Sequence, residues 1–271
     1  MPAFINTNIA SLNSQRNLNG SQGSLHTSVQ RLSSGLRVNS AKDDASGLAI
    51  ASRMESQIRG LNQAIRNASD GISLAQTAEG ALGTIQSNLA RMRELAVQGA
   101  NATSNADIAS LDAEFTQLNA ENSRVIQATI FNNIPLLSAA VNQTFQVGAN
   151  SAAGVDDLTI TTAAALIPTS TTLGDSSTAA QAEIVKLDMD IAAVSSLRAS
   201  FGSAQTRFES AISNLQIAAE NQTASRSRIM DTDYAAETSA LTRAQILQQA
   251  GTAMSAQANQ SPNGVLTLLR G

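Results

Sequence analysis

The sequence predicts a mainly α-helical protein, a long antiparallel helical bundle or coiled coil with a small central β-hairpin region. The four prolines stand at positions 2, 135, 168 and 262, so 3–134 and 169–261 lack the strongest helix breaker. A long stripe of apolar residues at helical spacing runs through the first of these segments. The chain has six Phe, one Tyr and no Trp, which argues against a thick aromatic core and favours closely packed helices.

The apolar stripe repeats at spacings of three and four residues, the pattern of a helix that packs along other helices. It predicts a helix of roughly 43 residues, on the order of 65 Å long. Ser40, followed by Asp43 and Asp44, is predicted to mark the start of this helix, and Gly99 its end. The stripe consists of Met54, Ile58, Leu61, Ile65, Ala68, Ile72, Ala75, Ala78, Leu82, Ile85, Leu89, Met92 and Ala96.

Two further helices and a hairpin complete the predicted middle of the chain. One helix starts at about Ser104. The second proline-free segment, 169–261, which we call the C-terminal arm as 3–134 is the N-terminal arm, repeats the apolar stripe between Ile184 and Leu215. Three such helices predict an antiparallel bundle. Between the arms, 143–147 and 158–162 alternate with period two around a stretch rich in turn residues, which predicts a β-hairpin.

Both ends of the chain carry thinner apolar stripes, interrupted near the N-terminus by Gly20 and Gly23. Such segments are marginal helices in water, so they need partners, and the nearest are each other and other copies of the chain. We therefore predict that these two stripes form an assembly surface. Its residues are Ile5, Ile9, Leu12, Leu25, Val29, Leu32, Leu36, Leu241, Ile246, Leu247, Met254, Val265, Leu266, Leu268 and Leu269.

These patterns predict three regions. Residues 1–42 and 235–271 form a discontinuous pair of terminal coiled-coil segments. Residues 43–137 and 178–234 form the helical bundle, and 138–177 form a short central hairpin and loop.

Residues suited to catalysis are scarce. The chain has no Cys, which excludes disulfides, thiol nucleophiles and Cys-based metal sites. The single histidine, His26, is interpreted as a helix-surface residue, and the acid pairs at 43–44 and 231/233 as helix starts. Asp156 and Asp157 could hold a surface cation, but a solvated turn is the simpler interpretation. Phosphate-loop, dinucleotide and zinc-protease motifs are absent. We expect no enzyme, no cofactor and no metal.

Charge and hydropathy limit the partners. The net charge of −4 argues against nucleic acid, which requires a basic face. No segment approaches ~18 consecutive apolar residues, so we expect no membrane insertion. The first eight residues lack the basic and apolar regions of a secretory signal, which taken alone indicates a cytoplasmic protein.

Several long motifs stand in order along both ends of the chain. Near the N-terminus, Ile5 to Asn8 read INTN, 32–47 read LSSGLRVNSAKDDASG, and 66–80 read RNASDGISLAQTAEG. Near the C-terminus, 229–235 read IMDTDYA, 248–251 read QQAG, and 258–262 read ANQSP. Together these motifs resemble the bacterial flagellin family, the subunits of the flagellar filament. The resemblance covers nearly the whole chain, and only the centre, about 138–180, is generic. The chain is similar to short flagellins with a reduced central region.

The resemblance implies a structural subunit that folds and polymerises together with its copies into the filament used for motility. It implies that the terminal segments line an inner tube and that the bundle forms an outer tube. It also implies type III export of the unfolded chain, hence a secreted, extracellular location in the flagellum, which overrides the cytoplasmic interpretation. Implied partners are other copies of the chain, an export chaperone, and filament cap and junction proteins.

The resemblance also implies contact with Toll-like receptor 5 of a host. The family's arginine and leucine of the recognised segment correspond to Arg91 and Leu95 in LARMRELAV, and its glutamate corresponds to Glu114. Ala90 departs from the glutamine common in the family, which predicts weaker binding. Alternatively, Arg91 and Glu114 form an axial packing pair between subunits with Leu95 beside them, and both roles are compatible.

Other functions stay open at the level of sequence. One is the related hook–filament junction protein, and another is a surface adhesin or glycan binder built on the same scaffold. The Ser- and Thr-rich centre would accept O-glycans, or it is a plain polar loop.

Overall fold

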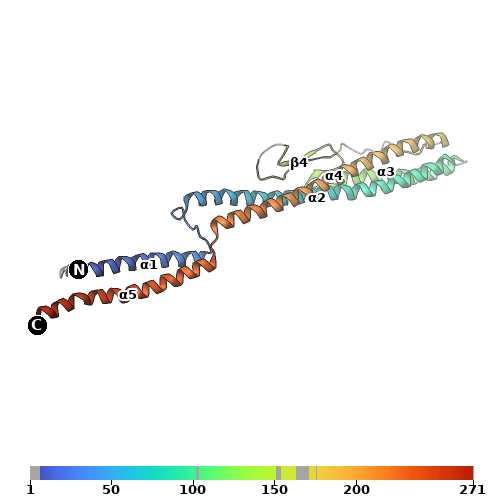
Figure 1. The fold of residues 1–271 in the computed structure, drawn as a ribbon. Helices are drawn as coiled ribbons and strands as arrows, with labels where there is room; N and C mark the ends of the chain where they lie inside the picture. Colours follow the sequence, from blue (N-terminus) through green and yellow to red (C-terminus); the bar gives the residue numbers. More distant parts are fainter. Residues whose placement is uncertain (1–6, 102–103, 151–153, 163–170, 175, 271) are drawn as a thin grey trace. The chain divides into compact units, whose positions relative to one another are not determined.

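The computed structural model describes residues 7–101, 104–150, 154–162, 171–174 and 176–270, with the backbone alone for 105 and 261–270. These residues form five helices and two two-stranded sheets, which confirms the predicted mainly α-helical fold (Figure 1). The helices are α1 (Ile9–Ser34), α2 (Ala45–Ala100), α3 (Asn105–Ala128), α4 (Ser177–Met230) and α5 (Tyr234–Arg270). The strands are β1 (Ile130–Phe131), β2 (Ile134–Pro135), β3 (Asn142–Gln146) and β4 (Asp157–Thr161).

The chain divides into two compact units, Met1–Ser56 with Gln222–Gly271, and Gln57–Asn221. Helices α2 and α4 contribute residues to both units. The three regions expected from the sequence, divided at 42/43, 137/138, 177/178 and 234/235, remain a prediction. Three of these divisions fall at or near helix ends, because 35–44 connect α1 to α2, α4 begins at Ser177, and 231–233 connect α4 to α5.

Helix α2 is longer than its apolar stripe, with 56 residues instead of roughly 43. The stripe begins at Met54, and the helix starts nine residues earlier with turns in which Ala51 packs in a separate small cluster with Val38 and Met230. The predicted start was wrong by one turn: Asp43 accepts the backbone N–H of Ser40 at 2.9 Å and closes a turn before the helix. Asp44 instead caps α2 by accepting the N–H of Gly47 at 2.8 Å.

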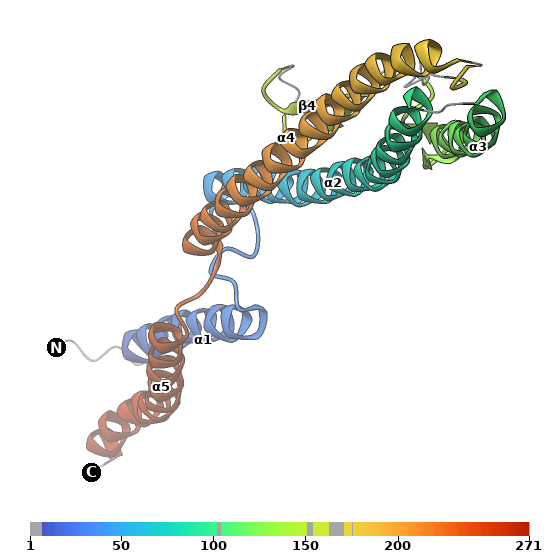
Figure 2. The same cartoon turned by 90° about the vertical axis from the view of Figure 1, so that its right-hand side faces the viewer.

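The larger unit has its core where α2, α3 and α4 meet. Phe115, Phe201 and Phe208 are at most 2% exposed and pack with leucines of the predicted stripe. Arg93 pairs with Asp188 at 2.7 Å, whereas residues earlier in α2 lie beside the later residue Phe208 of α4, so the two helices are antiparallel. Both views place α3 alongside the C-terminal part of α2 (Figures 1 and 2). The predicted three-helix bundle is therefore confirmed.

The central region contains two hairpins, one predicted and one not. Strands β3 and β4 pair antiparallel with Gln143 opposite Ile160, so the expected hairpin is confirmed to within one residue. Strands β1 and β2 form a second, shorter hairpin around Asn132 and Asn133. Both asparagines have positive φ angles, 47° and 64°, as a two-residue hairpin turn of this kind requires. The Asn-Asn pair between short apolar runs was the available signal.

In the smaller unit, the segment after α1 pairs with the end of α4. The backbone N–H of Arg37 donates to the carbonyl of Met230 at 2.6 Å, and that of Thr232 donates to Gly35 at 2.9 Å. Gly35 has a φ of 72°, the left-handed geometry that ends α1. These bonds hold the two connecting segments together at the ends of α1 and α4.

Candidate interaction interface on the terminal helices

Helices α1 and α5 lie side by side and run antiparallel (Figure 1). At one end, the side-chain amide of Asn8 donates a hydrogen bond to the carbonyl of Ala258 at 2.7 Å. One turn further, the hydroxyl of Ser11 donates to the side-chain oxygen of Asn259 at 2.7 Å. Asn8 also caps α1 by accepting the N–H of Ser11, so one side chain both starts the helix and fixes its register.

The other end of the pair is held by different chemistry. Arg31 and Glu237 form an ion pair of 3.6 Å, with 33% and 13% of their side chains exposed. The hydroxyl of Tyr234 donates to the carbonyl of Leu32 at 2.8 Å. Together with the contacts at the first end, these interactions fix one register along the length of the pair.

The surface between the two helices is built mainly from small residues. Ser11, Ser28 and Ala244 are its buried members, at 7%, 5% and 3% exposure. At Gly251 a Cβ atom would lie 3.3 Å from the Leu18 side chain, so the backbones approach closely there. Small side chains allow this approach, but they bury little apolar area.

Of the ten terminal-stripe residues whose side chains the structure describes, six face away from that surface. Leu25, Leu32, Leu36 and Leu241 are half-buried. The side chains of Ile5, Val265, Leu266, Leu268 and Leu269 lie outside the described residues. We call the remaining six the exposed apolar set; each is between 51% and 61% exposed. They are Ile9, Leu12, Val29, Ile246, Leu247 and Met254.

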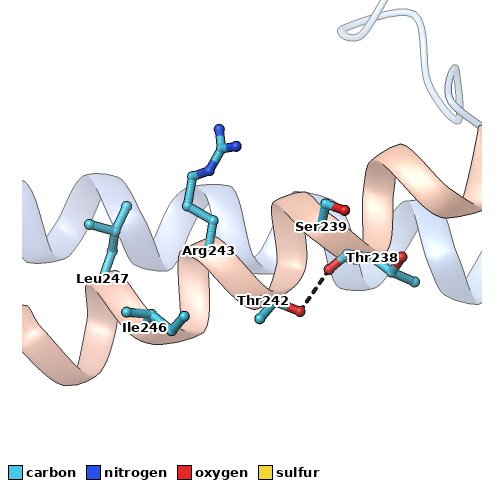
Figure 3. A pocket seen from close by; sticks show the side chains of 6 residues that line it. All are labelled: Thr238, Ser239, Thr242, Arg243, Ile246 and Leu247. Carbon is cyan, nitrogen blue, oxygen red and sulfur yellow. Dashed lines mark hydrogen bonds between the residues drawn. The ribbon is translucent and has the colours of Figure 1, made fainter.

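Leu247, a member of this set, lines two hollows. One, of about 670 Å³, is a groove between α1 and α5 whose walls include Gly20, Leu247, Gly251 and Met254. The other is lined by α5 residues alone, among them Arg243, Ile246 and Leu247, so it is a face of one helix (Figure 3). A small ligand is normally enclosed on most sides, and these shallow hollows suit another helix better.

The second predicted site lies in the larger unit. Arg91 Nε donates to Glu114 at 2.9 Å, and its Nη1 donates to Glu94 at 3.0 Å. These hydrogen bonds, that to Glu114 first and that to Glu94 second, raise the pKa of Arg91. About half of each side chain of the Arg91–Glu114 pair is exposed. Leu95 is only 1% exposed, so its side chain belongs to the bundle core and not to the surface beside the pair.

The single histidine and the acidic residue before α5 lie at ordinary structural positions. His26 lies on the exposed side of α1. Asp233 caps α5 by accepting the N–H of Ala235 at 2.9 Å, as its interpretation as a helix start requires. Within the described ranges, no three acidic or histidine side chains are grouped as metal binding would need. None of the described helices is long and apolar enough to span a membrane.

A helical bundle whose terminal helices pair through small residues and expose large apolar ones defines a structural protein that associates with other helices. The helical-region models of bacterial flagellin match almost all of both arms, the N-terminal model at 5–142 and the C-terminal model at 184–269. The chain therefore belongs to the bacterial flagellin family.

The relatives agree with this assignment over their full length. Flagellin of Halalkalibacterium halodurans is 48% identical over 272 residues, covering 98% of this chain and 100% of the relative. Flagellin of Bacillus subtilis is 40% identical, with coverage of 98% and 99%. The crystal structure of Bacillus cereus flagellin superposes with a TM-score of 0.50 at 34% identity, covering 55% of this chain and 88% of that one.

This membership fixes the class of function. The chain is a flagellar filament subunit, a structural protein and not an enzyme. The relatives are flagellins, which favours the filament subunit over the junction protein and the adhesin.

Proposed function

We propose that the exposed apolar set makes the contacts between copies of the chain in the filament. This proposal is supported by the division of the α1 and α5 residues into two kinds. Small residues form the contact between the two helices, and large apolar residues remain exposed. Burying the exposed half of one such side chain against a neighbour contributes about 1 kcal/mol. Every copy carries the same six exposed residues. Their burial between copies therefore stabilises the filament and contributes nothing to the isolated monomer.

The same division supports coupled folding and assembly. A helix pair closed by Ser, Ala and Gly buries little apolar area, so its stability in an isolated chain is low. The cost of ordering the two ends is then offset when neighbouring copies cover the exposed apolar set. Successive copies would contact each other through different surfaces. When the rotation that relates one copy to the next does not close into a ring, such contacts extend into an open helix of subunits.

Deletion of residues 240–271 tests this proposal, because it removes three members of the exposed apolar set and most of α5. We expect the shortened chain to retain the helical signal of the bundle by circular dichroism and to give no growth from filament seeds. The full-length chain under the same conditions is the control. Growth of the shortened chain at the full-length rate would overturn the proposal.

We further infer that the chain is secreted and extracellular, and that an export chaperone covers the exposed apolar set before assembly. Filament cap and junction proteins would contact the same helices at the ends of the polymer. Isolating the chain with a bound chaperone, and losing that complex on Leu247→Ser, would support this inference. An equally stable complex with the variant would count against it.

We also propose that Toll-like receptor 5 recognises the bundle through the Arg91–Glu114 pair. The half-exposed Arg91–Glu114 pair supports it, because its charged groups are accessible to a partner. Leu95 would act only by supporting Arg91 from the core. We expect Arg91→Ala to reduce receptor activation and Ala90→Gln to raise it, measured with the monomer. Arg124→Ala, which removes another exposed arginine of the bundle, is the control.

A further inference from the structure

The β3–β4 hairpin is held firmly against the bundle by one edge and one face. The ring of Phe145 meets that of Phe208 edge-to-face at 5.5 Å. The side-chain amide of Asn67, on α2, donates to the carbonyl of Gln146 at 2.9 Å. Because Gln146 is in β3, helix α2 covers part of the β3 edge.

The hydrogen-bond pattern shows which backbone groups the hairpin leaves outward. Val147 donates to Asp156 at 2.7 Å, and Thr162 donates to Val141 at 2.9 Å. Bonded pairs alternate with non-bonded pairs in an antiparallel ladder. The N–H and C=O groups of 157, 159 and 161 therefore point away from β3. Within the described part of the chain, no strand other than β3 pairs with β4.

The sequence of β4 leaves this edge open to pairing. Natural edge strands are blocked by lysine, proline or a bulge, and the strand Asp157–Thr161 reads DLTIT, with none of these. Its β-branched residues favour an extended strand. The only charge, on Asp157, lies at one end, where the carboxylate accepts the N–H of Gly154.

We propose that β4 pairs antiparallel with β4 of a second copy of this chain, about a two-fold axis at Thr159. Thr159 then faces Thr159 of the second copy, and Asp157 faces Thr161, so no two like charges are opposed. Thr144 and Thr159 already form a hydroxyl pair of 3.2 Å on the exposed face. The second copy extends this pair into a threonine ladder across four strands, and six outward N–H and C=O groups on each copy find partners.

The pairing is independent of the filament contact. A two-fold axis closes after two copies, whereas a filament contact between different surfaces stays open. Strand pairing therefore gives a dimer of free chains, or joins chains that belong to two different filaments. It does not need α1 or α5, so it can fail while assembly through the terminal helices holds.

Cysteine cross-linking of the full-length chain tests the register, because the natural chain contains no Cys. In Thr159→Cys the two Cα atoms of the dimer lie about 5.5 Å apart, within reach of a disulfide. In Thr161→Cys, on the same strand and face, they lie about 14 Å apart. Under mild oxidation, we expect the Thr159→Cys chain to form covalent dimers at least about ten-fold faster than the Thr161→Cys chain. Equal rates, or no dimer from either variant, overturn the proposal.

Sedimentation equilibrium measures the dimer a second way, without cysteine substitutions or cross-linking. Thr159→Lys places two ammonium groups opposite each other across the axis and should abolish the dimer. Thr144→Lys adds the same charge to the same exposed face, but on β3. We expect the Thr144→Lys chain to retain most of the dimer, with circular dichroism confirming that both variants fold. Loss of the dimer in both variants, or in neither, contradicts pairing through the β4 edge.

Discussion

The side chain of Asn8 donates a hydrogen bond of 2.7 Å to the carbonyl of Ala258, 250 positions further along the chain. This contact sets the register in which α1 and α5 pair, since the Ser11–Asn259 bond follows one turn later. With that register fixed, Ser28 and Ala244 are buried, while Leu12 and Leu247 stay exposed.

The exposed apolar set should matter for assembly and not for monomer folding. Leu247 is 53% exposed on α5, so we expect Leu247→Ser to change the free energy of unfolding of the monomer by less than about 0.5 kcal/mol. Seeded filament growth, followed by light scattering, should become several-fold slower. Ile217, 56% exposed on α4, provides the control, and Ile217→Ser should grow normally. Similar growth of the two variants would remove the assembly role of Leu247.

Two glycines of α2 should respond oppositely to alanine. A Cβ at Gly71 would lie 2.7 Å from the buried ring of Phe208, whereas one at Gly80 has no neighbour within 4 Å. We expect Gly71→Ala to destabilise the fold by about 1–3 kcal/mol through overpacking. Gly80→Ala should stabilise it by about 0.5–1 kcal/mol, because alanine favours the helix. Urea unfolding measures both, and a stabilising Gly71→Ala would show that Phe208 has room to move.

The turn between β1 and β2 should tolerate glycine and reject valine. Asn132 and Asn133 both have positive φ, which costs a β-branched residue about 1–2 kcal/mol. We expect Asn132→Val to lower the thermal midpoint and Asn133→Gly to maintain or raise it. Identical midpoints for the two variants would mean that the turn changes its geometry without cost.

Acid should weaken the start of α2 through Asp44. The pKa of its carboxyl is lowered, first by the hydrogen bond from the Gly47 N–H and then by that from the Ser46 hydroxyl. A group whose pKa is lower in the folded state stabilises the fold above its ordinary value of about 3.9 and loses that contribution as the pH falls through the folded pKa.

The variant Asp44→Asn keeps an oxygen that can cap the helix but does not titrate. Its thermal midpoint should therefore fall less than that of the unmodified chain between pH 5 and pH 2, in the acid range where aspartate titrates. Carboxyl chemical shifts of Asp44 report the titration directly. Parallel pH curves for the two chains would rule out a contribution from Asp44.

The sequence predicted the parts of the fold that depend on neighbours along the chain. The spacing of Leu82, Leu89 and Met92 identified the core face of α2, because the helical repeat alone decides which residues share a face. Alternation in β3 and β4 likewise predicted the hairpin. The start of α2 was misplaced because Ser40 and Asp43 form a turn of their own, and two adjacent acids offered two equivalent caps.

The terminal stripes show what depends on contacts distant in the chain. The sequence by itself determined that Leu12, Leu25 and Leu247 lie on apolar helix faces and that these helices need partners. Only the tertiary structure decided that Leu25 turns partly inward while Leu12 and Leu247 remain exposed. The physical reason is the register of α1 against α5, set by polar bonds such as Asn8 to Ala258 and by the close approach at Gly251. Helical periodicity carries no information about that register.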